Sequence, residues 1–419
     1  MDLKGKKVTI IGAARSGIAA ANLAYGQGAV VKITDAKPLA DIDKALAGLA
    51  DRSKAIVEAG AHTRKFVQDS DIVVASPGVR KDAEPLQWAR EKGIPVMGEI
   101  EFAWCFCTKP VIAVTGSNGK TTTVNLIAEV LKAGGNTVCL CGNVGTPFAQ
   151  HVLTPGIDYF VVEISSFQLE LCVTFRPYIA VLTNFSQNHL DRHPDMQDYF
   201  EAKKRVFMNQ TASDFSILNA ADPWSQKIEA GVSSQVVFFN KAGEARNPNH
   251  LAVLEVARIV GISDDMACKV FEAFPGVEHR MELVRILKGV EYVNDSKATT
   301  AESGLWALTR MAAPIIMICG GHDKGEIDFS ALKDLVKAKI KKMIVLTRED
   351  VVRKKLHDAF EGVVPIEDYT DMGEALRAAQ TQAVSGDKVL LSPMFASFDM
   401  FKNFEERGKV FKQMVNDLR

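Results

Sequence analysis

The chain has 419 residues, a formal net charge of −1 and 47% hydrophobic residues. This length exceeds what one hydrophobic core usually serves, so we expect two or three folded domains. The near-neutral charge argues against nucleic acid as the main partner, because contacts with phosphates need a surplus of basic residues. No apolar leader opens the chain, and no apolar run reaches about 18 residues. We therefore expect a cytoplasmic protein that does not insert into a membrane.

Residues 1–107 alternate predicted strands and helices, which favours a parallel sheet. The predicted strands are KKVTIIG (6–12), VVKITD (30–35) and DIVVASPG (71–78), and the alanine-rich stretch 16–28 is predicted to be helical. The turn after the first strand contains Gly12 and Gly17, but Ala14 stands where a dinucleotide-binding fingerprint has glycine. With Asp35 at the end of the second strand, an NAD site stays an alternative for this segment.

Residues 108–275 form a second predicted α/β segment, which opens with VIAVTGSNGKTTT at 111–123. The apolar residues predict a buried strand, TGSNGK predicts a tight turn, and the residues up to Gly134 predict a helix. Glycines in such a turn let backbone N–H groups converge on phosphate oxygens, and the helix N-terminus adds partial positive charge. We expect Lys120 to reach terminal phosphates and the Thr121 hydroxyl to bind Mg²⁺. The predicted ATP-binding residues of the loop are Gly116, Ser117, Asn118, Gly119, Lys120, Thr121 and Thr122.

Two polar residues of this segment follow predicted strands. Glu163 lies in DYFVVEIS (158–165), and His189 follows IAVLTN (179–184). A carboxylate at the carboxyl end of a strand beside a phosphate loop is where an Mg²⁺ ligand belongs. A plain strand-end charge and a structural histidine are the alternatives.

Residues 276–419 again alternate strands and helices, with strands predicted at 314–321, 341–347 and 387–393. The basic run 333–343 has apolar residues at helical spacing and is predicted to be a solvated helix face. We therefore predict a three-domain α/β fold. It would comprise a Rossmann-like N-terminal domain at 1–107, a central P-loop-type ATPase domain at 108–275 and a C-terminal Rossmann-like domain at 276–419.

Motifs in all three segments resemble the Mur ligase family. Only two residues separate Gly116 from Gly119, so the loop departs from the common G-x-x-x-x-G-K-[ST] pattern. Its variant, T-G-x-x-G-K-T-x-T, is similar to that of the Mur ligase and folylpolyglutamate synthase superfamily. The further motifs are NFSQNHLDRH (184–193), YFEAKKRVF (199–207), VNDSKATTAES (293–303) and LLSPMFASFDMFKNFEERGKVF (390–411). The last two resemble the members that add D-glutamate.

The resemblance implies a metal centre and a set of catalytic residues. Lys203 would be carbamylated by CO₂, which requires a neutral amine and hence a lowered pKa. The carbamate would then be an oxygen ligand for a second Mg²⁺. The implied metal ligands are Thr121, Glu163, His189 and Lys203, and the implied catalytic residues are Lys120, His189 and Lys203.

The resemblance also implies three groups of substrate-binding residues. ATP would further contact Asn247, Arg280 and Asp295, although His250 stands where the family has a second asparagine. The UDP substrate would contact Ala14, Arg15, Asp35, Lys37, Ser76, Gly78 and Asn143. D-Glutamate would contact Lys297, Thr299, Lys324, Ser397, Phe398 and Phe404; Thr300 replaces the usual asparagine of that motif.

The activity implied by the resemblance is ATP-dependent ligation of D-glutamate to UDP-MurNAc-L-Ala through an acyl phosphate. We expect ATP and two Mg²⁺ ions as cofactors and a monomeric enzyme. Three alternatives stay open at this point: a sister ligase such as a folylpolyglutamate synthase, an NAD-binding oxidoreductase, and a nucleotide-switched binding protein that performs no ligation.

Overall fold

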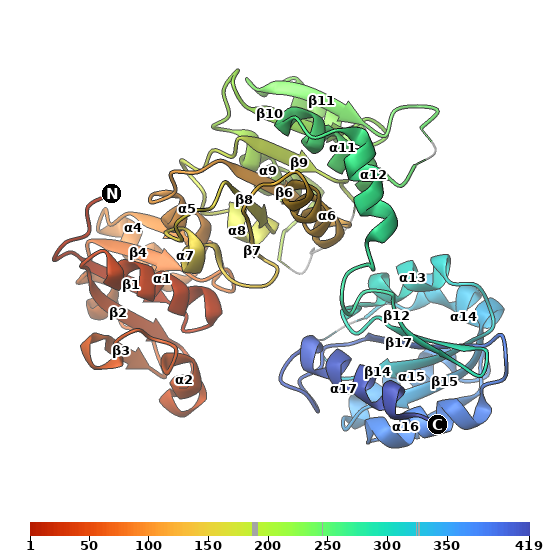
Figure 1. Cartoon of the computed structure of the whole chain (residues 1–419). Coiled ribbons are helices and arrows are strands. Elements are labelled where there is room, and N and C mark those ends of the chain that lie inside the picture. Colours follow the sequence, from red (N-terminus) through yellow and green to blue (C-terminus); the bar gives the residue numbers. More distant parts are fainter. Residues whose placement is uncertain (187–191, 245, 324, 326) are drawn as a thin grey trace. The chain divides into compact units, whose positions relative to one another are not determined.

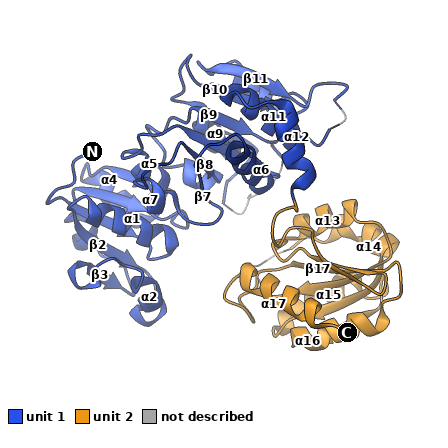
Figure 2. Ribbon diagram, viewed as in Figure 1, with its two compact units in different colours: residues 1–274 blue, residues 275–419 orange. Residues whose placement is uncertain are grey.

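The computed structural model describes residues 1–186, 192–244, 246–323, 325 and 327–419. Three sheets flanked by helices follow one another along the chain (Figure 1). The chain divides into two compact units, Met1–Phe274 (unit 1) and Pro275–Arg419 (unit 2) (Figure 2). Unit 1 contains the first two sheets and unit 2 contains the third. The alternation of strands and helices predicted from the sequence is therefore confirmed in all three segments.

The first sheet has five parallel strands in the order β3-β2-β1-β4-β5. Its strands are β1 (Lys7–Ile11), β2 (Val30–Asp35), β3 (Ile56–Ala59), β4 (Ile72–Ala75) and β5 (Val96–Gly98). Its helices are α1 (Arg15–Gly26), α2 (Leu39–Leu46), α3 (Arg64–Gln68), α4 (Glu84–Glu91) and α5 (Glu99–Trp104). In such a sheet the loops that follow the strands lie along one edge.

The second sheet has six parallel strands in the order β11-β10-β9-β6-β8-β7. Its strands are β6 (Val111–Thr115), β7 (Val138–Gly142), β8 (Tyr159–Glu163), β9 (Ile179–Leu182), β10 (Phe215–Asn219) and β11 (Gln235–Phe239). Its helices are α6 (Lys120–Ala133), α7 (Phe148–His151), α8 (Ser166–Leu169), α9 (Met196–Lys204), α10 (Pro223–Glu229), α11 (Pro248–Val260) and α12 (Asp264–Ala273). Every residue of β6 is buried, as expected for a central parallel strand covered on both faces.

The third sheet has the order β12-β13-β17-β14-β15-β16, and only β12 runs antiparallel to its neighbour. Its strands are β12 (Glu282–Leu287), β13 (Val290–Asn294), β14 (Ile315–Gly320), β15 (Ile340–Leu346), β16 (Ile366–Tyr369) and β17 (Lys388–Met394). Its helices are α13 (Ala301–Arg310), α14 (Lys333–Lys339), α15 (Asp350–Phe360), α16 (Met372–Gln382) and α17 (Phe404–Asp417). The helix predicted over 333–343 is thus wrong beyond Lys339, where β15 begins. None of the described helices is both long enough and apolar enough to cross a membrane.

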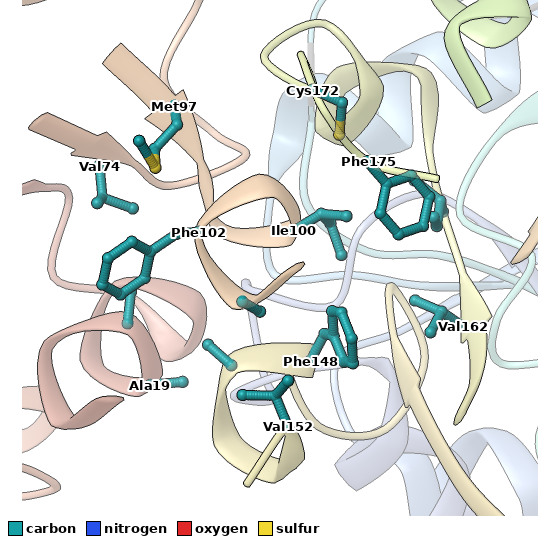
Figure 3. Packing of buried hydrophobic residues seen from close by; sticks show 14 of the residues in the cluster. Ala19, Val74, Met97, Ile100, Phe102, Phe148, Val152, Val162, Cys172 and Phe175 are labelled. Atoms are coloured by element: carbon teal, nitrogen blue, oxygen red, sulfur yellow. The ribbon is translucent and has the colours of Figure 1, made fainter. Parts of the chain in front are cut away.

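The two sheets of unit 1 share one hydrophobic cluster, and α5 lies at its centre. Figure 3 shows Phe102 of α5 pointing toward Ala19 and Val74 of the first sheet's layers, whereas Ile100 points toward Phe175. Because the same buried cluster continues into both sheets, the two sheets are packed as one body. The predicted domain boundary at 107 lies inside this unit and stays a prediction.

Two buried glutamates of α5 attach this helix to the second sheet. Glu101 accepts hydrogen bonds from the backbone N–H groups of Val173 (2.9 Å), Thr174 (2.7 Å) and Phe175 (3.0 Å). Glu99 Oε1 accepts one from the Ala149 N–H at 2.6 Å, while its Oε2 is buried without a partner among the described residues. Burial raises the pKa of Glu99 to about 7, and the backbone N–H groups that face it oppose the shift only in part.

We expect Glu99 to make unit 1 less stable as the pH rises. The pKa of Glu99 is higher in the folded than in the unfolded chain. Its stabilising contribution to the free energy of unfolding is therefore fully present below about pH 4.5. This contribution falls by up to about 3 kcal/mol as the pH rises toward 7. Glu99→Gln keeps a carbonyl for Ala149 and cannot ionise. Urea unfolding followed by tryptophan fluorescence should therefore show a smaller loss of stability between pH 5 and 8 than in the wild type.

The matched control is Glu129→Gln, which removes an exposed carboxylate paired with Lys132. It should keep the wild-type pH dependence. An unchanged pH dependence in Glu99→Gln would contradict the assignment of this effect to Glu99.

Candidate active site

The turn between β6 and α6 has a backbone conformation that requires glycine at two positions. Gly116 has φ +146° and Gly119 has φ +81°, both in the region that favours glycine. A Cβ at Gly116 would lie 2.0 Å from Thr183 Oγ1, and a Cβ at Gly119 would lie 2.5 Å from Asn249 Oδ1. The strand, glycine turn and helix expected from the sequence are therefore present, with α6 beginning at Lys120.

Residues that follow β9 hold the turn in place. Asn118 N–H donates to Asn184 Oδ1 at 3.0 Å, and Asn184 Nδ2 donates back to the Asn118 carbonyl at 3.0 Å. Thr183 Oγ1 donates to the same carbonyl at 2.6 Å, and Ser117 Oγ donates to the Ser186 carbonyl at 2.9 Å. This network pre-forms the loop backbone, so a ligand would not have to order it on binding.

The side-chain amino groups of two lysines converge on the carbonyl of Gly116. Lys120 Nζ donates to it at 2.8 Å and to the Ser117 carbonyl at 2.9 Å, and Lys203 Nζ of α9 donates to the Gly116 carbonyl at 2.8 Å. Lys203 is only 2% exposed. Burial holds the pKa of Lys203 well below its usual value, the charge of Lys120 lowers it further, and Glu163 opposes the shift. The arrangement favours a neutral amine at Lys203.

Glu163 lies at the end of β8 beside this loop, level with Val114 of β6. Its Oε1 accepts a hydrogen bond from Asn143 Nδ2 at 2.8 Å, and its Oε2 is buried without a partner among the described residues. A buried carboxylate oxygen next to a phosphate loop fits a hard cation such as Mg²⁺. Thr121 is buried at the start of α6. His189 lies outside the described residues.

A pocket of about 570 Å³, the cross-sheet pocket, is lined by loops of both sheets of unit 1. All seven residues predicted to contact the UDP substrate line it, namely Ala14, Arg15, Asp35, Lys37, Ser76, Gly78 and Asn143. Loops after β1, β2 and β4 form one side, and the loop after β7 forms the other. Gln168 also lines the pocket, and nothing in the sequence alone indicated it.

Asp35 and Ser76 shape this pocket through the backbone of the β1–α1 turn. Asp35 Oδ2 accepts a hydrogen bond from the Ala13 N–H at 2.7 Å, and its Oδ1 accepts one from the Lys37 N–H at 2.9 Å. Ser76 Oγ donates to the Gly12 carbonyl at 2.9 Å. In this structure the Asp35 carboxylate therefore supports the turn while it lines the pocket.

Asn249, which the sequence reasoning missed, lies against the phosphate loop beside Gly119. The predicted residue Asn247 caps α11, its side chain accepting from the Asn249 N–H at 3.0 Å. His250 stacks on Phe271 with ring centroids 4.4 Å apart. The spacing from Asn247 was the only available signal for Asn249, and it pointed to position 250 instead.

In unit 2, Arg280 and Asp295 lie near each other before and after the first two strands. Asp295 accepts hydrogen bonds from Ser392 Oγ at 3.0 Å and from the Met281 N–H at 3.2 Å. Burial raises the pKa of Asp295 to about 7, and the Ser392 hydroxyl and Arg280 oppose the shift. Arg280 Nε is buried without a partner among the described residues.

Of the residues predicted to contact D-glutamate, Lys297 and Thr299 follow β13, Ser397 and Phe398 follow β17, and Phe404 begins α17. Lys297 Nζ is 5.8 Å from the Phe404 ring centroid, Ser397 is buried, and Phe398 is 64% exposed. Thr299 is half-buried, between β13 and α13. Lys324 lies outside the described residues.

Arg407 of α17 joins these two loops and was not assigned a role from the sequence. Its side chain donates to Ser296 Oγ at 3.0 Å, and to the carbonyls of Ser296, Ala396 and Phe395 at 2.9, 3.1 and 3.2 Å. Burial lowers the pKa of Arg407 to about 10, and Asp399 opposes the shift. One buried guanidinium thus holds together the loops that follow β13 and β17.

Three family descriptions match successive parts of the chain. Residues 6–98 match the Mur ligase MurD-like N-terminal domain, residues 114–284 the Mur ligase middle domain, and residues 279–395 the Mur ligase glutamate ligase domain. Two relatives, both named UDP-N-acetylmuramoylalanine–D-glutamate ligase, come from Koribacter versatilis and Pelotomaculum thermopropionicum. They are 37% and 38% identical to the chain, over 100% of the chain and 99% of each relative.

Solved structures show the same three-domain α/β fold, as the sequence predicted. The UDP-N-acetylmuramate–alanine ligase MurC of Thermotoga maritima matches 98% of the chain and 99% of its own length, with a TM-score of 0.61 and 16% identity. The MurF ligase of Thermotoga maritima, in complex with ADP, matches 99% of the chain and 96% of its own length, with a TM-score of 0.59 and 15% identity. Full-length relatives at this identity and three consecutive domain matches lead to one conclusion: the chain belongs to the Mur ligase family.

Proposed function

We propose that the chain is an ATP-dependent ligase that joins D-glutamate to UDP-N-acetylmuramoyl-L-alanine during peptidoglycan precursor synthesis. The observation that carries this proposal is the link between two sites of unit 1. Asn143 lines the cross-sheet pocket and also donates to Glu163, which stands beside the phosphate loop. A substrate in the pocket would therefore end close to a bound triphosphate. The name shared by the matched relatives supports the same reaction.

ATP would bind with its phosphates on the pre-formed loop from Gly116 to Thr122. Lys120 would exchange the carbonyls of Gly116 and Ser117 for oxygens of the terminal phosphates. Asn247, Arg280 and Asp295 are proposed to contact the rest of the nucleotide, and Asn249 joins them because of its place beside Gly119.

The UDP part of the second substrate would occupy the cross-sheet pocket. Arg15 and Lys37 supply positive charge at its walls, which suits a diphosphate. Arg15 Nη1 donates to the Gly145 carbonyl at 3.3 Å, so this cation is already held across the pocket. The sugar and its alanine carboxylate would extend past Asn143 toward the loop.

The chemistry proceeds through two displacement steps. A carboxylate oxygen of the substrate attacks the γ-phosphorus, the new O–P bond forms, and the bond to the ADP oxygen breaks. The amine of D-glutamate then attacks the acyl carbon, the C–O bond to phosphate breaks, and the amine loses a proton. Lys120 would stabilise the charge that develops on the transferred phosphoryl group. Mg²⁺, held by Thr121, Glu163, His189 and carbamylated Lys203, would supply further positive charge there.

Carbamylation of Lys203 follows from the chemistry of a buried amine. A neutral amine nitrogen attacks CO₂, a C–N bond forms, one proton leaves, and the product is an anion. This reaction turns the neutral amine next to the Lys120 cation into an anion, so Lys120 and Lys203 then attract each other. It also supplies the oxygen ligands that an ammonium group lacks.

D-Glutamate is proposed to bind in unit 2, at the loops joined by Arg407. The proposed contacts are Lys297, Thr299, Lys324, Ser397, Phe398 and Phe404. The domain limits at 107 and 275, the cytoplasmic location and the monomeric state stay predictions.

An activity assay tests the proposed reaction. Phosphate release from ATP should require UDP-MurNAc-L-Ala and should be fastest with D-glutamate in a panel of amino acids. Lys120→Ala should reduce phosphate release by at least about 100-fold, because a positioned cation on the transferred group is lost. Calorimetry should show that this variant still binds the UDP substrate. Loss of both properties together would mean that Lys120 acts structurally.

Depletion of CO₂ tests the carbamate. Wild-type activity should fall in CO₂-free buffer and return with added bicarbonate. Lys203→Ala should be inactive with or without bicarbonate. Its control is Lys204→Ala, at the neighbouring position, which should keep the wild-type response. Full activity of Lys203→Ala would contradict the proposal.

The glycine turn is tested by one methyl group. Gly116→Ala places a Cβ into Thr183, so it should abolish binding of a fluorescent ADP analogue. Gly135→Ala, after the same helix, also has positive φ but meets nothing within 4 Å. It should cost about 1 kcal/mol of stability and leave ADP affinity unchanged. Equal ADP affinity in both variants would contradict the role of the turn.

A further inference from the structure

Arg192 holds one wall of the cross-sheet pocket from outside it. Its Nη1 donates to the Pro77 carbonyl at 3.0 Å, and its Nη2 donates to the Val79 carbonyl at 3.0 Å. Both acceptors belong to the wall formed by residues 76–79, and the Arg192 side chain is 13% exposed. A planar guanidinium can bind two carbonyls of one loop at once, which fixes the path of the backbone between them.

The same guanidinium also contacts residues that follow β8. Arg192 Nη2 lies 3.3 Å from Glu170 Oε2, and its Cζ lies 4.2 Å from the centroid of the Phe167 ring. Phe167 belongs to α8, which begins three residues after Glu163, and Glu170 directly follows this helix. Arg192 therefore connects the pocket wall to the segment that follows Glu163, the proposed metal ligand, in the chain.

A second set of ion pairs extends the connection to α9, the helix of Lys203. Lys81, two residues beyond the wall, lies 2.7 Å from Asp198 Oδ1 and 3.9 Å from Glu170 Oε1. His193 Nδ1 shares a hydrogen bond with Asp198 Oδ2 at 2.7 Å. Asp198 is five residues before Lys203 on α9. Glu170, His193 and Asp198 have ligand-type atoms within 4.8 Å of one another, but Lys81 already pairs with Asp198 and Arg192 pairs with Glu170.

We propose that Arg192 is a positioning residue that sets the pocket wall at 76–79 in register with the helices beside Glu163 and Lys203. The inference rests on the proposed function, because it concerns the UDP end of that same substrate. Without the guanidinium the carbonyls of Pro77 and Val79 would lose their donor. Binding of the substrate would then have to order the loop 76–79. The substrate would then bind more weakly. The phosphate loop would keep its shape, because the hydrogen-bond partners of Arg192 among the described residues are Pro77, Val79 and Glu170.

The test measures three properties of Arg192→Met and Arg192→Lys in the full-length protein. For Arg192→Met we expect the dissociation constant of UDP-MurNAc-L-Ala, measured by calorimetry without ATP, to rise at least about tenfold. The dissociation constant of ADP should stay within about twofold of the wild-type value. Arg192→Lys keeps the charge but not the fork, so it should also bind the UDP substrate more weakly than the wild type. Circular dichroism melting reports whether each variant folds.

The matched control is Arg176→Met, which removes another partly exposed arginine of unit 1. Arg176 pairs with Asp214 at 2.7 Å, away from the cross-sheet pocket, so this variant should bind the UDP substrate normally. Wild-type affinity for the UDP substrate in both Arg192 variants would overturn the inference. Equal losses of UDP-substrate and ADP affinity in both would also overturn it, because they indicate a general structural role. A wild-type protein that binds the UDP substrate but ligates no amino acid would refute the proposed function and leave this test intact.

Discussion

The convergence of Lys120 and Lys203 on the Gly116 carbonyl is the interaction on which the rest of the site depends. Two ammonium groups at one carbonyl repel each other, and burial increases the effect because little water screens them. The Glu163 carboxylate and the lowered pKa of Lys203 offset this repulsion, and Asn184 fixes the shape of the loop. A triphosphate and a carbamate would each relieve the same repulsion, which explains why one site can favour both.

The packing of unit 1 determines how the phosphate loop is connected to the cross-sheet pocket. The two sheets share one hydrophobic cluster around α5, and Glu101 binds three successive backbone N–H groups of the second sheet's segment. Because the sheets form one body, a pocket lined by loops of both keeps its shape. Asn143 then joins that pocket to Glu163 beside the phosphate loop through one hydrogen bond.

The sequence predicted the parts of the site that are local in the chain. The phosphate loop and α6 follow from glycine spacing and helix-type residues, and Glu163 follows from its place at a strand end. The residues around the cross-sheet pocket lie far apart in the chain, and the family resemblance rather than any pattern suggested them. Arg192 and Arg407 were missed because their partners include backbone carbonyls of distant loops, which no spacing reveals. Asn249 was missed because the spacing from Asn247 pointed to position 250. The helix predicted over 333–343 ran too far because a buried strand beginning at Ile340 continues its apolar pattern.

The central claim is that the substrate carboxylate attacks ATP directly at the loop around Lys120. Its most direct test uses UDP-MurNAc-L-Ala in which both oxygens of the terminal carboxylate are the heavy isotope. After turnover with ATP and D-glutamate, mass spectrometry of the released phosphate should find one labelled oxygen in each molecule, because the acyl phosphate passes that atom to phosphorus. Phosphate without label, formed at the same rate as the amide, would contradict the account.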